Sequence, residues 1–174
     1  LILGGSGVGN LTISSGGTVT SSAAGGAFVG QSPGSDGRVT VTGSGSRWLM
    51  NGGAFIVGLS GSGEVTVSNG GEFSGTSLTF GSVPSGTGVV AVTGAGSKET
   101  LTGSASVASA GAGTLNVTAG GEFYALRLTN GDPAGTPIGT LNLDGGSIYI
   151  GDDFTNGGVF TFTDGLLQVA AVLL

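Results

Sequence analysis

The segment Gly61–Gly71 reads GSGEVTVSNGG. In its centre Val65 and Val67 alternate with Thr66 and Ser68, and glycines stand at both ends. Alternation of apolar and polar residues predicts a half-buried β-strand, and glycine-rich stretches predict a change of chain direction. The segment therefore describes one short strand between two corners.

The same pattern recurs along the whole chain. Its copies are VGNLTISSGG (8–17), GSDGRVTVTGSGS (34–46), GTGVVAVTGAGS (86–97), GAGTLNVTAGG (111–121), IGTLNLDGG (138–146) and a degraded VFTFTDG (159–165). The first inward apolar residues are Leu11, Val39, Val65, Val90, Leu115, Leu141 and Phe160, so that subtraction gives intervals of 28, 26, 25, 25, 26 and 19 residues. A period near 25 residues accommodates three short strands and three corners, whereas a propeller blade needs about 40–45 residues. We predict an all-β fold, a right-handed parallel β-helix (β-solenoid) of six to seven coils.

The composition agrees with a folded β-solenoid. The chain has 174 residues, of which 40 are glycine and 38% are apolar. Glycine inside a helix costs about 1 kcal/mol relative to alanine, which excludes helical repeats. The apolar residues keep a period of two inside the repeats, which a disordered linker has no reason to do. We predict a single solenoid segment over residues 1–174, and the apolar ends LIL (1–3) and LLQVAAVLL (166–174) indicate a fragment of a longer repeat protein.

Two forms of the repeat alternate. The first, third and fifth copies end in Gly-Gly (16–17, 70–71 and 120–121), whereas the second and fourth carry the pattern TG-x-GS (42–46 and 93–97). The larger repeat is therefore a pair of coils, near 52 residues long. Insertions around residues 83–88 and 131–137, which contain Pro84, Pro133 and Pro137, interrupt the pattern.

The repeats resemble those of a known group of bacterial surface proteins. The segments GVGNLTISSGGTVTS (7–21), GRVTVTGSGSRW (37–48), FIVGLSGSGEVTVSNGGEF (55–73) and AGTLNVTAGGEF (112–123) are similar to repeats of autotransporter (type V secretion) passenger domains and of surface proteins with PEP-CTERM sorting signals. The resemblance covers residues 7 to about 158. It implies a right-handed parallel β-helix displayed outside the cell, and it carries over no catalytic residue.

The charged residues exclude several classes of partner. The formal net charge is −6, and Arg38, Arg47, Lys98 and Arg127 are the only basic residues. Four scattered basic residues do not neutralise a nucleic-acid backbone or form a polybasic membrane patch. No run of about 20 apolar residues is present, so we expect no membrane insertion of this segment. The chain lacks cysteine and histidine, which removes disulfides, thiolate metal sites and histidine-based triads.

Aspartates form the densest group of carboxylates. Asp152 and Asp153 follow Asp144 by one strand, and β-helical glycosidases would use two carboxylates about 5–9.5 Å apart. Adjacent residues of a strand point to opposite faces, so we favour a solvated corner over a catalytic pair. Calcium-binding β-rolls place aspartate at a fixed position in every repeat, whereas Asp36, Asp132 and Asp152 occupy different positions. We predict no catalytic, cofactor-binding or metal-binding residues, no cofactor and no enzymatic activity.

The outward residues of the first strand and the large aromatic residues each suggest a binding surface. The outward residues of the first strand form a Thr-x-Thr array that also suits an ice-binding solenoid, but we favour ordinary packing of β-branched hydroxyl residues on an exposed face. Its members are Thr12/Ser14, Thr40/Thr42, Thr66/Ser68, Ala91/Thr93, Asn116/Thr118, Asn142/Asp144 and Thr161/Thr163. Trp48, Phe55 and Tyr124 are compatible with a sugar-stacking surface, but large aromatics more often fill the core of a coil.

The leading functional prediction is a structural one. We expect an extracellular or cell-surface β-solenoid that forms a stalk, fibre or surface-layer unit and that continues or self-associates end to end. The first alternative is an adhesin passenger that binds a surface or glycan through loops such as 82–87 and 130–138. The second is a β-helical carbohydrate-active enzyme.

Overall fold

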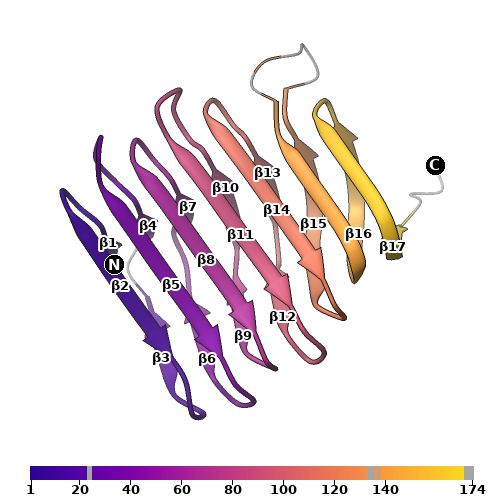
Figure 1. The fold of residues 1–174 in the computed structure, drawn as a ribbon, viewed down its shortest axis with the longest axis horizontal. Coiled ribbons are helices and arrows are strands. Elements are labelled where there is room, and N and C mark those ends of the chain that lie inside the picture. Colours follow the sequence, from indigo (N-terminus) through magenta and orange to yellow (C-terminus); the bar gives the residue numbers. More distant parts are fainter. Residues whose placement is uncertain (23–24, 133–135, 137, 171–174) are drawn as a thin grey trace.

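The chain folds into a parallel β-solenoid (Figure 1). The computed structural model describes residues 1–22, 25–132, 136 and 138–170. Every strand pairing among these residues is parallel, and the coils of about 25 residues make about six turns. The coils are stacked along the long axis of the molecule, with β1 and β2 at one end of the rod and β17 at the other. The predicted all-β solenoid and its coil length are confirmed.

Each coil contributes one strand to each of three faces. The first face holds β2 (Val8–Ile13), β5 (Asp36–Thr42), β8 (Ser62–Ser68), β11 (Thr87–Thr93), β14 (Ala112–Thr118) and the first parts of β16 (Thr140–Asn156) and β17 (Val159–Val169). The second face holds β3 (Thr18–Ser21), β6 (Arg47–Met50), β9 (Glu72–Gly75), β12 (Lys98–Leu101), the first part of β15 (Glu122–Asn130), the middle of β16 and the end of β17. The third face holds β1 (Ile2–Leu3), β4 (Ala27–Val29), β7 (Ala54–Val57), β10 (Ser77–Phe80), β13 (Ser104–Val107) and the last parts of β15 and β16.

The register of the first face reproduces the alignment of the sequence repeats. Successive paired residues along this face are Leu11, Val39, Val65, Val90, Leu115, Leu141 and Phe160. These are the residues that mark the six intervals in the sequence. Because a slip of one residue would turn every side chain to the other face, the repeat pattern determines the pairing as well as the strands.

The interior is filled by columns of like residues, one per coil. One such column on the first face consists of Val41, Val67, Val92 and Val117. None of the four side chains is exposed. Larger rings fill the space between the second and third faces. The indole ring of Trp48 lies 4.9 Å from the ring of Phe55 and 5.3 Å from that of Phe73, measured between centroids, and its Nε1 donates to Ser21 Oγ at 3.1 Å.

A column of glycines lies at the corner where the third face meets the first. Gly37, Gly63, Gly88 and Gly113 pair with one another in register. A Cβ atom on Gly63 would overlap the carbonyl oxygen of Val29 in β4. At Gly88 the overlap would be with the carbonyl oxygen of Val57. Neighbouring backbone segments approach one another so closely at this corner that only glycine fits there.

A hydrogen bond between neighbouring coils accounts for the two alternating forms of the repeat. The Oγ atoms of the buried Ser46 and Ser97 each accept a bond of 3.1 Å, from the backbone N–H groups of Gly16 and Gly70 respectively. Those glycines are the first members of the Gly-Gly pairs in the preceding coils. In the sixth copy no serine is present, and Gly120 N–H donates to the carbonyl oxygen of Gly145 at 2.6 Å instead. The coil pair is therefore a physical unit, a glycine corner stacked on a serine corner.

Some predicted inward residues do not lie in the core. The apolar residues that follow Phe123 in the fifth copy predict that Leu126 and Leu128 both point inward, but Leu126 is 45% exposed because a bulge between Ala125 and Arg127 shifts the register. Phe162 pairs in register with the buried Leu143, but it is 52% exposed because no described coil covers it. Val169 pairs with the buried Ile150 and is exposed for the same reason, whereas Leu166, also expected to point inward, pairs with Ser147 at an outward position of β16 and faces away from the core. Pro133, Pro137 and residues 171–174, on which sequence predictions also fell, lie outside the described residues.

Candidate functional site

The aspartates of β16 do not converge. Asp152 and Asp153 lie within the strand, on the third face, whereas Asp144 lies at the end of the first face. Asp152 Oδ2 accepts a hydrogen bond of 2.6 Å from Arg127 Nε in the preceding coil, and Asp153 Oδ2 accepts one of 3.0 Å from Thr155 Oγ1. Both residues lie where β16 passes from the second face to the third and its register shifts, so the structure does not contradict the predicted solvated corner, and Asp152 takes part there in an ion pair. The structure does not bring the three carboxylates together as an acid–base pair.

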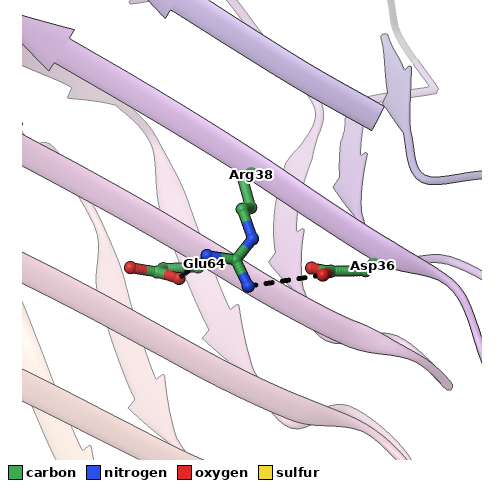
Figure 2. Close-up of polar contacts among 3 residues, drawn as sticks. All are labelled: Asp36, Arg38 and Glu64. Carbon is green, nitrogen blue, oxygen red and sulfur yellow. Dashed lines mark hydrogen bonds and ion pairs between the residues drawn. The ribbon is translucent and has the colours of Figure 1, made fainter. Parts of the chain in front are cut away.

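Asp36, one of the three aspartates considered for calcium, also faces a cation of the chain itself. Arg38 lies between Asp36 and Glu64, and its guanidinium nitrogens lie 3.3 Å and 3.2 Å from their carboxylate oxygens (Figure 2). Asp132 and Asp152 lie in other coils. Within residues 1–22, 25–132, 136 and 138–170, no three acidic residues gather in a group that would hold a metal ion.

The four basic residues, which appear scattered in the sequence, each pair with an acidic residue one coil away. The further pairs are Arg47–Glu72 at 3.2 Å, Lys98–Glu122 at 4.0 Å and Arg127–Asp152 at 2.6 Å. The partners are separated by 24 to 26 residues in the chain, so opposite charges at the coil spacing would have revealed them. Since the side chains are largely exposed, we expect each pair to contribute between 0 and about 1 kcal/mol. Because each pair joins two neighbouring coils, we interpret these charges as aligning the coils and not as binding a ligand.

The aromatic residues divide between the core and the surface. Trp48 and Phe55 are buried in the ring cluster described above, as the core interpretation predicts. Tyr124 instead faces outward and stacks on Tyr149 of the next coil, with ring centroids 4.4 Å apart and planes 10° from parallel. Lys98 Nζ lies 4.3 Å from the centre of the Tyr124 ring. Partial burial and the hydrogen bond from the Tyr124 hydroxyl to Glu122 Oε2 raise the pKa of this phenol to about 12.

A shallow groove of about 340 Å³ runs beside the two tyrosines. Its lining includes Thr102, Leu126 and Gln168 together with Tyr124 and Tyr149, from four successive coils. Since Tyr149 and Lys98 occupy the faces of the Tyr124 ring, this residue presents its edge to the groove. The exposed Leu126 contributes apolar surface to this lining, and sequence reasoning missed it because the bulge has no marker in the sequence.

The outward residues of the first face hydrogen-bond to one another across the coils. Ser68 Oγ donates to Thr42 Oγ1 at 3.0 Å, and Thr118 Oγ1 donates to Thr93 Oγ1 at 2.9 Å. Asn142 Nδ2 likewise donates to Asn116 Oδ1 at 2.8 Å. These contacts use hydroxyl and amide groups that an ice-like water lattice would need, which favours the packing interpretation of the Thr-x-Thr array.

One carboxyl group lies in the core. Glu99 on β12 has no exposed surface, and neither of its carboxyl oxygens has a hydrogen-bond partner. Its neighbours in register are Phe73 in the coil before and Phe123 in the coil after. Burial raises the pKa of the Glu99 carboxyl from 4.5 to about 8. The burial of Glu99 could have been predicted from the sequence, because Glu99 precedes the inward Leu101 by two positions and therefore faces the same side of the strand.

Comparisons with protein-family models, with curated proteins and with solved structures give no match. The solenoid fold that the resemblance implied is present, but membership of the autotransporter or PEP-CTERM groups stays a prediction. The described residues contain no helix, and hence none that is long and apolar enough to cross a membrane.

Proposed function

We propose that this chain is a structural segment of an extracellular or cell-surface solenoid, a rigid stalk, fibre or surface-layer unit. The observation that carries the proposal is the use of the side chains. Ion pairs at the coil spacing and hydrogen bonds between outward hydroxyl and amide groups connect one coil to the next. Such an arrangement supports a rod that holds its shape, and we propose no catalytic activity for it.

The two ends of the described rod support continuation beyond it. At the C-terminal end, β17 and the last part of β16 have no strand beyond them among the described residues. This end exposes Phe162, Val159 and Val169, whose exposed fractions are 52%, 51% and 41%. At the other end Ile2 and Val8 are 53% and 75% exposed. A free strand edge with uncovered apolar residues pairs readily with another strand, so we propose end-to-end continuation by further coils or by a second copy.

The test uses the 174-residue chain in sedimentation-velocity and electron-microscopy experiments. We expect elongated oligomers whose length increases with concentration. The double variant Phe162→Lys/Val169→Lys should be monomeric, because two charges at the free edge oppose strand pairing. The matched control Ser62→Lys/Ser104→Lys adds the same charge at exposed positions on the sides of the rod and should assemble like the parent. A parent chain that stays monomeric at all concentrations would contradict continuation by a second copy.

The groove beside Tyr124 and Tyr149 favours a second candidate function, adhesion through glycan binding. Its volume of about 340 Å³ lies at the lower end of the range for small-ligand sites. Apolar surface from Leu126 beside the hydroxyl of Tyr149 and the amide of Gln168 suits the mixed polar and apolar surface of a sugar. Of the loops that the sequence indicated, 82–87 lies outside this lining and part of 130–138 lies outside the described residues.

A glycan array distinguishes the two candidates. If the groove binds glycans, the parent chain should retain specific glycans, and Leu126→Asp should abolish that binding because a charge would replace the apolar wall. The control Ser104→Asp, at an exposed position outside the lining, should bind like the parent. Equal glycan binding by Leu126→Asp and the parent, or no binding by either, would remove this second candidate.

A further inference from the structure

The most unusual group in the rod is the carboxyl of Glu99. Among the described residues it is the only buried side chain that can ionise, since the other buried polar residues are Ser35, Ser46, Ser97 and Asn130. A carboxylate without a partner is strongly disfavoured in an apolar interior, and such a group normally stays protonated or moves into water. A structural rod has no evident need for it, because apolar residues fill the equivalent positions in the neighbouring coils.

The surroundings of Glu99 contain nothing that would neutralise its charge. Phe73 of β9 and Phe123 of β15 pair with it in register from the two sides. The titratable residues of the packed elements lie at outward positions of their strands: Glu64 of β8, Glu72 of β9, Lys98 of β12 itself, and Glu122, Tyr124 and Arg127 of β15. No cation therefore compensates an ionised Glu99 while the coil is closed.

We propose that the coil containing Glu99 is a pH-sensitive weak point in the middle of the rod. With the carboxyl group protonated, β12 stays paired with β9 and β15. Loss of the proton favours an open form, in which β12 separates locally from its neighbours and the carboxylate reaches water. The opening would uncover the rings of Phe73 and Phe123, while the coils at a distance keep their own ladders, because coils of a solenoid contact only their nearest neighbours.

The direction of the pH dependence follows from the raised pKa. Below the unfolded-state pKa of about 4.5 the group is protonated in both states, and its protonated form is fully accommodated by the closed coil. Between pH 4.5 and about 8 the closed coil holds a proton that the open form releases, so the opening equilibrium increases up to tenfold for each pH unit. Above about pH 8 both forms are ionised and the equilibrium no longer depends on this group. Stability of the coil is therefore lost as the pH rises.

Hydrogen exchange followed by mass spectrometry measures the opening directly. Protection factors, which correct for the intrinsic pH dependence of exchange, are compared at pH 5, 6, 7, 8 and 9 for peptides of β9, β12 and β15 and for distant peptides of β2 and β5. In the parent chain we expect protection of the first set to fall with pH and that of the second set to stay constant. Glu99→Gln should remove the pH dependence, because the amide does not ionise.

Two further variants make the result decisive. Glu99→Leu matches the apolar residues of its column and should give high protection at every pH, which keeps the test valid if Glu99→Gln folds poorly. Glu72→Gln changes the same chemical group at an outward position of β9 and should keep the parent's pH dependence. A pH-independent parent, or an unchanged pH dependence in both Glu99→Gln and Glu99→Leu, would overturn the proposal.

Discussion

At the scale of single residues, alternation between the two sides of a strand decides where each side chain lies. Val67 has no exposed surface and packs in a column between Val41 and Val92, whereas Thr66, one position earlier, lies on the outer side. The glycine corner at the start of every coil determines which residues of the following strand face inward. One substitution, placed at two adjacent positions, therefore tests the side assignment.

Val67→Asp should lower the free energy of unfolding by several kcal/mol, roughly 3–5, because it removes a buried methyl pair and places an unpaired carboxylate between coils. Thr66→Asp should lower it by less than about 1 kcal/mol, since that side chain meets water. Chemical denaturation followed by circular dichroism measures both values. Equal losses in the two variants would mean that the sides of the strand are assigned incorrectly.

The residue scale also shows where sequence reasoning succeeded and where it failed. The inward apolar residues and their register were predictable, because one phase of period two recurs at every coil. The ion pairs Arg47–Glu72 and Arg127–Asp152 were predictable in principle from charges one coil apart. The exposure of Leu126 was not, because the bulge beside it arises from the packing of β15 on β16. The groove was missed for the same reason.

At the scale of elements, the contact between one corner and the next stabilises the stack. Ser97 Oγ accepts from Gly70 N–H at 3.1 Å and donates to the carbonyl oxygen of Thr93 at 2.7 Å, so a single hydroxyl joins two coils. The sequence showed the alternation of Gly-Gly and TG-x-GS corners but not its cause, since a bond between coils has no local pattern. The serine at position 97 is explained by the neighbouring coil on which its corner is stacked, and not by the type of turn alone.

Ser97→Ala should lower the free energy of unfolding by about 1–3 kcal/mol, because the backbone N–H of Gly70 would lose its partner in a partly buried site. The control Ser44→Ala removes an exposed hydroxyl from the neighbouring corner of the second coil and should change stability by less than about 0.5 kcal/mol. Thermal or urea denaturation suffices for the comparison. An Ser97→Ala variant as stable as the Ser44→Ala variant would show that the bond between corners contributes nothing.

At the scale of the whole molecule, the rod is a sum of coil pairs. Val65 and Leu115 occupy equivalent positions two coils apart, with Val90 between them in register. Removal of residues 65–114, which joins Glu64 to Leu115, therefore deletes one complete pair. It also places Glu122 above Arg47, where Glu72 stood, and Phe123 above Trp48, where Phe73 stood.

This deletion should yield a shorter rod that still folds, reduced in length by about 10 Å at roughly 4.8 Å per coil. Removal of residues 65–113 leaves one extra residue, Thr114, and turns the following strand to its opposite side, so that variant should not form an ordered β-structure beyond the junction. Circular dichroism and small-angle scattering distinguish the two products. Similar folding of both deletions would show that the register is not determined by the repeat.

The direction of the backbone hydrogen bonds has a mechanical consequence. They join coil to coil and therefore run along the rod, while the strands run across it. Tension applied through β2 and β17, which lie at opposite ends of the rod in Figure 1, would peel the outermost coil away, loading its bonds one after another. A load applied sideways, across the stack, would have to shear three ladders at once and would meet far greater resistance. The fold is thus anisotropic: weak when unwound from its ends and strong when bent or pressed along its flanks.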